Sequence, residues 1–202
     1  MSYRFARFLS IVLHPALMPA YAIFLIFQLS SYLNYTTPYS VKLVLFTVVV
    51  FNTFIMPVFI VYLLLKRGYI KSFNMEERNE RSVPFVVQAI LMMITYYMLL
   101  RLELPRIFYL MLLGAAISVL IVVLINLKWK ISIHMVGIGG IAGMLLGLST
   151  LLFLDLRMPV IISILFAGIL GTARLRMGAH RPAQIYVGYL VGFVCEYFIL
   201  AI

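Results

Sequence analysis

The chain has 202 residues, of which 65% are hydrophobic and 11% are charged, and its mean hydropathy is +1.12. Water-soluble domains are roughly half apolar and about a quarter charged, so this composition argues against a soluble enzyme, a disordered chain and a nucleic-acid-binding protein. Sixteen Lys and Arg against six Asp and Glu give a net charge of +10, which in so apolar a chain favours contact with lipid phosphates. The sequence therefore predicts an integral membrane protein with membrane lipids, and not nucleic acid, as its partners.

A helix needs about 20 apolar residues to cross the hydrocarbon core of a membrane, and seven segments between charged clusters approach that length. They lie at residues 10–33, 41–65, 84–101, 105–127, 133–154, 158–174 and 182–201. The basic N-terminus resembles a signal peptide, but His14, Pro15 and Pro19 interrupt its apolar stretch, so we expect it to remain as the first helix. Because the sixth segment is short, the predicted fold is an all-α polytopic membrane helix bundle of six to seven transmembrane helices. Residues 1–202 form one predicted domain.

Metal, disulfide and dinucleotide sites are not expected in this chain. Its single cysteine, Cys195, cannot form an internal disulfide, and no Cys/His cluster has the spacing of metal ligands. The glycine-rich stretch 137–143 lies inside an apolar span with no strand before it, which argues against a dinucleotide loop. We therefore predict no metal and no cofactor.

Glycines at four-residue spacing occur in two of the predicted helices. Gly139, Gly143 and Gly147 lie in one helix, and Gly188 and Gly192 lie in the last. Small residues at this spacing allow membrane helices to approach closely. We therefore expect these helices to pack tightly through their glycines.

The alternation of helices assigns each loop to one face of the membrane, and the cations are distributed unequally between the two faces. Four lie on one face, and the other face holds the remaining twelve: Arg4, Arg7, Lys66, Arg67, Lys71, Arg78, Arg81, Lys128, Lys130, Arg174, Arg176 and Arg181. All three histidines, His14, His134 and His180, are near predicted helix ends on this cation-rich face. The positive-inside rule places this face in the cytoplasm, and its polar cluster favours a functional site there.

The richest polar stretch, residues 173–184, reads Ala-Arg-Leu-Arg-Met-Gly-Ala-His-Arg-Pro-Ala-Gln. Pro182 suits the first turn of the last helix, so His180 precedes that helix and Gln184 lies in its first turn. The imidazole of His180 and the amide of Gln184 are therefore expected to lie close together. Alternatively, the arginines are interfacial anchors and His180 is an ordinary polar residue with satisfied hydrogen bonds.

A second polar stretch, residues 128–134, precedes the glycine-rich helix. Ser132 is expected to be its N-cap, and the free N–H groups near His134 would suit an anion. The two lysines that flank Trp129 are equally typical of a residue belt at the membrane interface.

The two stretches resemble motifs of the type 2 phosphatidic acid phosphatase superfamily. Its third motif is Ser-Arg, five residues, His, three residues, Asp, and Arg174, His180 and Gln184 have this spacing. Its second motif is Pro-Ser-Gly-His, which Ser132 and His134 resemble at the start of a helix, in the family's order.

The first motif of that superfamily is Lys, six residues, Arg-Pro. It is suggested by Lys71 and Arg78 at the right interval, or by Arg81 followed by Pro84. With these residues the resemblance covers a motif-bearing core of about residues 66–192.

This resemblance implies a lipid phosphatase with a phosphohistidine intermediate. It implies that His180 is the nucleophile and His134 the general acid, while the remaining matched residues would hold phosphate: Arg174, Arg78 or Arg81, Lys71 and Ser132. The implied substrate is a lipid phosphomonoester or pyrophosphate, such as phosphatidate, phosphatidylglycerol phosphate or an isoprenyl pyrophosphate. The implied location is a bacterial inner membrane, with the site on its outer side, opposite to the side that the charge count indicates. The sequence does not define the oligomeric state.

The chain also departs from the family motifs. Gln184 replaces an Asp that would hold the nucleophilic histidine and stabilise its cationic form, although the amide oxygen of Gln184 is still expected to orient the ring. Ile133 replaces a Gly that would lie against phosphate. Ala173 and Ile131 replace a Ser and a Pro. These departures leave a second hypothesis open, in which a catalytically silent relative binds anionic lipid head groups or acts in transport or assembly. A carboxylate from Glu76, Glu77 or Glu80 would compensate for Gln184 if it reached His180.

Two polar residues stand apart from the motifs. His14 starts the first helix on the cation-rich face, where it either borders the site or is a helix-end histidine with satisfied hydrogen bonds, and we expect the second. Glu196 lies sixteen residues beyond His180, about 24 Å along a helix, so we expect it near the opposite interface, pairing with Arg101 or Arg106.

Overall fold

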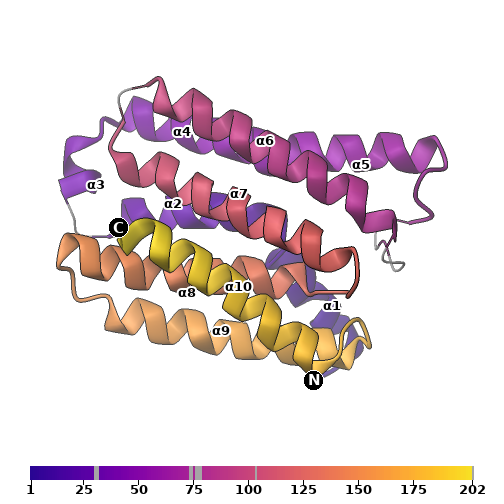
Figure 1. The fold of residues 1–202 in the computed structure, drawn as a ribbon. Helices are drawn as coiled ribbons and strands as arrows, with labels where there is room; N and C mark the ends of the chain where they lie inside the picture. The colour runs from indigo at the N-terminus through magenta and orange to yellow at the C-terminus, as the bar shows by residue number, and fades with distance from the viewer. Residues whose placement is uncertain (30–31, 73–74, 76–78, 103, 202) are drawn as a thin grey trace.

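The computed structural model describes residues 1–29, 32–72, 75, 79–102 and 104–201. Within these residues the chain is helical, without a strand, and seven helical segments are long and apolar enough to cross a membrane. The prediction of an integral membrane protein with an all-α helix bundle is therefore confirmed (Figure 1).

The helices follow one another in the order α1 (Tyr3–Val12), a 3-10 turn η1 (Pro15–Leu17), α2 (Met18–Gln28), α3 (Tyr32–Thr36), α4 (Tyr39–Val50), a π-helical turn η2 (Phe51–Ile55), α5 (Met56–Lys66), a 3-10 turn η3 (Asn79–Arg81), α6 (Ser82–Leu100), α7 (Arg106–Asn126), α8 (Ile133–Leu152), α9 (Arg157–Arg176) and α10 (Pro182–Ala201). The last five agree with the predicted spans to within a few residues. The sixth predicted span is longer than expected, because α9 has 20 residues.

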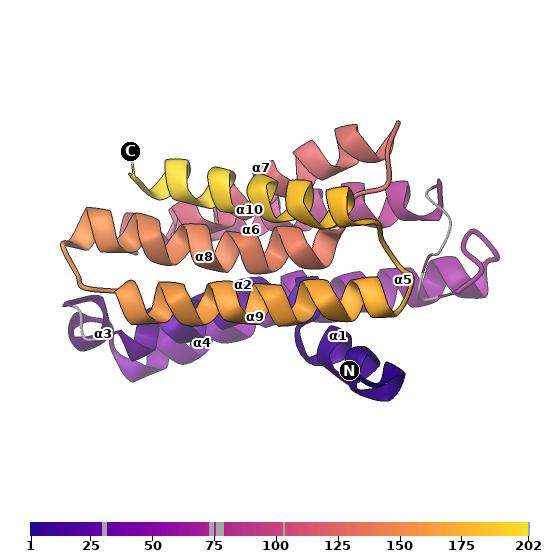
Figure 2. The same cartoon turned by 90° about the horizontal axis from the view of Figure 1, so that it is seen from below.

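The first predicted span is not one helix. His14 has an extended backbone (φ −67°, ψ 135°) and ends α1, since a residue before proline disfavours the helical region. Figure 2 shows α1 projecting from the bundle, while α2 runs within it. The prediction of a single helix over residues 10–33 is therefore wrong, and the break brings His14 to the end of the bundle.

The second predicted span is continuous but changes its winding at η2. Pro57 has no N–H to donate to the carbonyl four residues earlier, at Thr53, so the regular α-helical bonding pattern cannot continue there. A π-helical turn at Phe51–Ile55 takes up this mismatch.

The contact between α8 and α10 is the tightest in the bundle. A Cβ atom at Gly192 would overlap the carbonyl oxygen of Val136, and a Cβ atom at Gly139 would overlap the carbonyl oxygen of Tyr189. A Cβ atom at Gly188 would lie 2.7 Å from the carbonyl oxygen of Ser132. The predicted close packing through spaced glycines is confirmed, and it places the first turns of α8 and α10 side by side.

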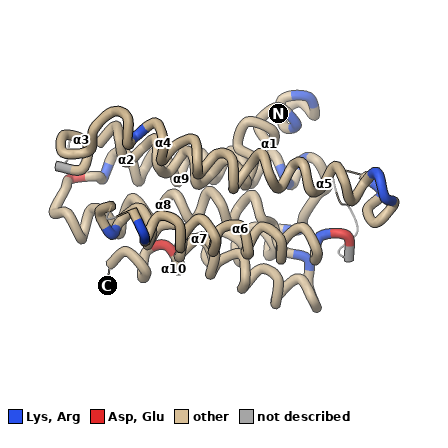
Figure 3. Tube along the Cα trace, turned by 90° about the horizontal axis from the view of Figure 1, so that it is seen from above, with Lys and Arg blue, Asp and Glu red and all other residues tan. Residues whose placement is uncertain are grey.

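One end of the bundle collects the polar loops. The start of α6, the end of α7, the start of α8, the end of α9 and the start of α10 all lie at this end, as does α1 (Figure 1). We call it the motif end. Charged residues gather at the two ends of the bundle and are sparse between them (Figure 3).

Candidate functional site

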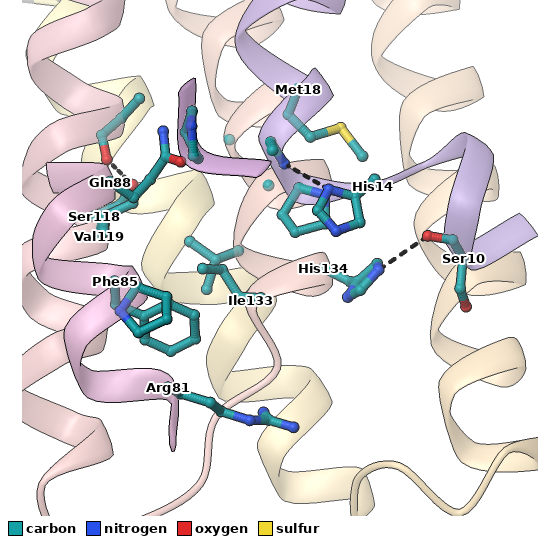
Figure 4. Close-up of a pocket in the computed structure, with 18 of the residues that line it drawn as sticks. Ser10, His14, Met18, Arg81, Phe85, Gln88, Ser118, Val119, Ile133 and His134 are labelled. Carbon is teal, nitrogen blue, oxygen red and sulfur yellow. Dashed lines mark hydrogen bonds between the residues drawn. The ribbon is translucent and has the colours of Figure 1, made fainter. Parts of the chain in front are cut away.

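A cavity of about 700 Å³ extends from the motif end into the bundle. Its polar lining includes Arg7, Ser10, His14, Arg81, Gln88, Ser118, Lys130, His134, Arg174, His180 and Glu196. Its apolar lining includes Met18, Phe85, Met92, Met111, Val119, Ile133 and Met144. Figure 4 shows part of this lining, with Arg81 and His134 facing the same space from different helices.

His180 is buried in the α9–α10 loop, and its tautomer follows from its neighbours. Its Nδ1 lies 3.2 Å from Oε1 of Gln184, and the backbone N–H of Arg181 donates to the same oxygen at 3.0 Å. An oxygen that already accepts from a backbone N–H is the amide carbonyl, so Nδ1 of His180 carries the proton and donates it. Nε2 therefore keeps its lone pair. The expected contact between Gln184 and His180 is present.

Positive charges surround His180. Its pKa is lowered to about 3, by burial first and then by Arg174 and Arg81, with a smaller effect of Lys130; the hydrogen bond to Gln184 acts in the opposite direction. The imidazole is therefore neutral at neutral pH, as a nucleophile must be. The same cations would attract an anion into the cavity.

Arg81 is buried at the cavity wall just before α6. Its Nε–H donates to the carbonyl of Met75 at 2.7 Å, which fixes the side chain. Burial lowers its pKa to about 10, with a further effect of Arg174 and an opposing effect of Glu80. Arg81 remains cationic at neutral pH, so it offers its other guanidinium donors to a ligand.

Arg174 lies in the last turn of α9 and lines the cavity. Its Nε is buried and has no hydrogen-bond partner within the described part of the chain. A buried charged donor without a partner is costly, so this N–H is available to an anion that enters the cavity.

His134 lies in the first turn of α8, and α1 holds its ring. Its Nε2 is 3.0 Å from the carbonyl oxygen of Ser10 (Figure 4). Because a carbonyl only accepts, Nε2 carries the proton, and Nδ1 is the ring nitrogen left free for proton exchange. The His134 and His180 regions are joined by a backbone hydrogen bond from Ser132 N–H to the carbonyl of Gln184, at 3.3 Å.

Two predicted phosphate ligands lie elsewhere. Ser132 occupies the N-cap position of α8, but its hydroxyl makes no capping bond; it is fully buried, does not line the cavity and has no partner among the described residues. It lies where α8 meets α10, because Gly188 packs directly on its carbonyl. Lys71 is exposed and outside the cavity, and Lys130 lines the wall instead. Arg78 lies outside the described residues.

The prediction for Glu196 is wrong. Its carboxyl lies between α7, α8 and α10: a Cβ atom at Gly114 would be 2.8 Å from its Oε2, and one at Gly140 would be 3.4 Å from its Cγ. Its Oε2 is buried without a hydrogen-bond partner among the described residues, and the side chain lines the cavity. The estimate of about 24 Å between His180 and Glu196 along the helix still holds. Glu196 nevertheless lines the cavity, because the cavity extends inward along α8 and α10 as far as this residue.

The sequence interpretation also misses two lining residues. His14 caps a helix end as expected, yet it also lines the cavity, and Arg7 of α1 does the same. The signal that could have found them was available, since both lie on the predicted cation-rich face. The sequence does not show that α1, beyond the break at His14, packs against α9.

Among the described residues, no carboxylate forms a hydrogen bond to His180 in place of the Asp that Gln184 replaces. Glu80 accepts from the backbone N–H of Lys71 at 2.9 Å, while Glu76 and Glu77 lie outside the described part. The described residues also contain no group of three or more His, Cys, Asp or Glu that could hold a metal ion. The titratable groups that line the cavity include imidazoles, guanidinium groups, the amine of Lys130 and the carboxyl of Glu196.

Comparison with protein-family models, curated proteins and solved structures gives no match to this chain.

Proposed function

We propose that this protein is a membrane lipid phosphatase that cleaves a phosphomonoester or pyrophosphate through a phosphohistidine intermediate. The observation that carries the proposal is that His134, His180, Arg81 and Arg174, from separate segments of the chain, line one cavity. These are the residue types that phosphoryl transfer needs: a nucleophile, an acid–base group and cations for the phosphoryl oxygens.

In the proposed reaction, the lone pair on Nε2 of His180 attacks phosphorus, and the bond from phosphorus to the lipid oxygen breaks. His134 gives a proton from Nδ1 to the leaving oxygen when it enters the cycle protonated. Water then attacks the phosphohistidine, phosphate leaves, and Nδ1 of His134 takes the proton of the water. Arg81 and Arg174 stabilise the charge that spreads over the phosphoryl oxygens in both steps.

The cavity is also suited to a lipid. Its volume of about 700 Å³ falls within the usual range of ligand pockets, about 300–1,000 Å³. Met92, Met111 and Met144 line its apolar part, and flexible methionines pack well against chains of varied shape. Phosphatidate, phosphatidylglycerol phosphate and isoprenyl pyrophosphates all combine such a chain with a phosphoryl head. We propose a bacterial inner membrane as the location, on the family resemblance.

A second candidate function is supported by two residues of the site. Gln184 offers the nucleophile a neutral partner, and Ile133 lines the cavity where the phosphatase motif has glycine. Both would weaken catalysis, and the neutral partner Gln184 would do so without weakening anion binding. The alternative is a catalytically silent protein that binds anionic lipid head groups, in transport or assembly.

Phosphate release from dioctanoyl phosphatidate by the detergent-purified protein tests the proposal. We expect His180→Ala to lose at least about 1,000-fold in kcat, because the nucleophile is absent. Arg174→Gln should lose about 10- to 100-fold in kcat/KM, since a hydrogen bond to a charged group contributes about 1.5–3 kcal/mol. Arg176→Gln is the matched control: this arginine lies two residues further along α9, exposed and outside the cavity, and its loss should have little effect.

Equal phosphate release by the wild type and His180→Ala would refute the phosphatase proposal. Binding of anionic lipid by the wild type and Arg176→Gln, but not by Arg174→Gln, would then favour the silent alternative.

A further inference from the structure

His14 belongs to the same cavity as the two motif histidines, and no motif assigns it a role. Its ring lies beside that of His134, with 5.6 Å between the ring centroids and an angle of 80° between the planes. Its position is fixed locally, because it is the N-cap of η1 and is followed by Pro15. Figure 4 shows the His14 ring at the cavity wall, between Met18 and His134.

The hydrogen bond that His14 makes defines its tautomer. Its Nδ1 accepts the backbone N–H of Ala16 at 3.3 Å, so the lone pair of this nitrogen is in use and the proton of the neutral ring lies on Nε2. In Figure 4 the bonded nitrogen faces away from His134, and the other ring nitrogen faces towards it. His14 therefore presents an N–H donor on the side of its ring where the cavity and His134 lie.

The three imidazoles thus differ in what they offer. The proton of His180 is directed to Gln184, and the proton of His134 is directed to the carbonyl of Ser10. Both rings are left with a free lone pair, whereas His14 is left with a free proton. The assembly contains one nucleophile, one acid–base group and one donor, each held by a fixed hydrogen bond to the protein.

We propose that Nε2–H of His14 donates a hydrogen bond to a non-bridging oxygen of the bound phosphoryl group. This role rests on the proposed function and adds a third catalytic histidine to it. A neutral donor suits this position because Arg81, Arg174 and Lys130 already supply positive charge to the cavity. A fixed donor directed at oxygens that gain charge in the transition state lowers the reaction barrier.

Two substitutions separate this role from simple helix capping. In His14→Asn, the side-chain oxygen can replace Nδ1 as the acceptor for Ala16 N–H, but the side chain is too short to place a donor where Nε2 of His14 lies. In His14→Gln, the side-chain NH₂ reaches the depth of Nε2, but the short capping acceptor is lost. If His14 only caps the helix, Asn is the better substitute; if it binds the phosphoryl group, Gln is.

We expect His14→Asn to keep the wild-type unfolding temperature in detergent and to lose about 100-fold in kcat on dioctanoyl phosphatidate, as when one oxyanion donor is removed. His14→Gln should unfold at a lower temperature and yet recover at least about tenfold of that loss. Wild-type kcat in His14→Asn, or lower kcat in His14→Gln than in His14→Asn at a temperature where both are folded, would overturn the proposal.

Equilibrium binding of orthovanadate and of inorganic phosphate separates failure of this inference from failure of the proposed function. If the wild type releases no phosphate from lipid but binds these anions, and His14→Asn binds them at least about tenfold more weakly, the donor role stands without the phosphatase. Equal binding by both proteins, or no binding by either, overturns the donor role. If vanadate and free phosphate bind while lipid phosphate is neither bound nor cleaved, the ligand of the site is a free anion and not a lipid head group.

Discussion

Replacing Gln184 with glutamate tests the central contact of the site. The side chains have the same length, so a carboxylate oxygen would occupy the place of Oε1, 3.2 Å from Nδ1 of His180 and 3.0 Å from the backbone N of Arg181. The substitution adds the negative charge that the phosphatase motif has at this position, and it keeps the hydrogen bonds. We expect Gln184→Glu to be more active than the wild type.

The expected gain in kcat is limited, because the amide of Gln184 already holds His180 in the correct tautomer. When Asp becomes Asn in a serine-protease triad, kcat falls by about 10⁴ because the histidine tautomer is wrong. Here the tautomer is already correct, so only the stabilising charge is missing. An adjacent carboxylate raises an imidazole pKa by about one to three units, which corresponds to about 10- to 1,000-fold. Because bonding to the nucleophile is weak in a loose phosphoryl-transfer transition state, we expect the lower part of this range, about tenfold in kcat.

The assay combines phosphate release with an NMR titration of the histidine ring signals. The pKa of His180, about 3 in the wild type, should rise by about one to three units in Gln184→Glu. Gln88→Glu is the control, because it adds the same charge to the cavity wall without the hydrogen bond to His180, and it should not raise kcat. A raised pKa with unchanged or lower kcat would refute the reasoning about charge, and an unchanged pKa would refute the contact itself.

Two further predictions concern stability. Gly192→Ala should lower the unfolding temperature in detergent, because its methyl group would overlap the carbonyl oxygen of Val136 and overpacking costs about 1–3 kcal/mol. Gly168→Ala is the control: the space around this position is open, so the substitution should be neutral or stabilising. Equal effects of the two substitutions would contradict the tight α8–α10 contact. The depressed pKa of His180, about 3 instead of 6.5, means that the unfolded chain binds a proton there between these values and the folded chain does not. The free energy of unfolding should therefore be unaffected by His180 above pH 6.5 and should decrease as the pH drops from 6.5 towards 3. Unfolding temperatures at pH 7 and pH 5 would measure this decrease, and the part due to His180 should be absent in His180→Asn.

Local regularities in the sequence were sufficient for much of the fold. Runs of apolar residues set the membrane spans, because each span must satisfy its own backbone hydrogen bonds in lipid. The four-residue spacing of glycines predicted the α8–α10 contact, because such residues share one face of a helix. The hydrogen bond between Gln184 and His180 was likewise predictable, since the two residues are only four apart at a helix start.

Membership of the cavity was decided by the tertiary structure. Ser132 and Lys71 have suitable chemistry and motif spacing, yet neither reaches the cavity, whereas His14 and Glu196 line it. The side of a helix that faces a cavity depends on how distant helices pack, and in a chain that is apolar almost throughout, hydrophobicity does not distinguish the sides. The break at His14 and the close approach of α10 to α8 therefore determined which polar groups meet.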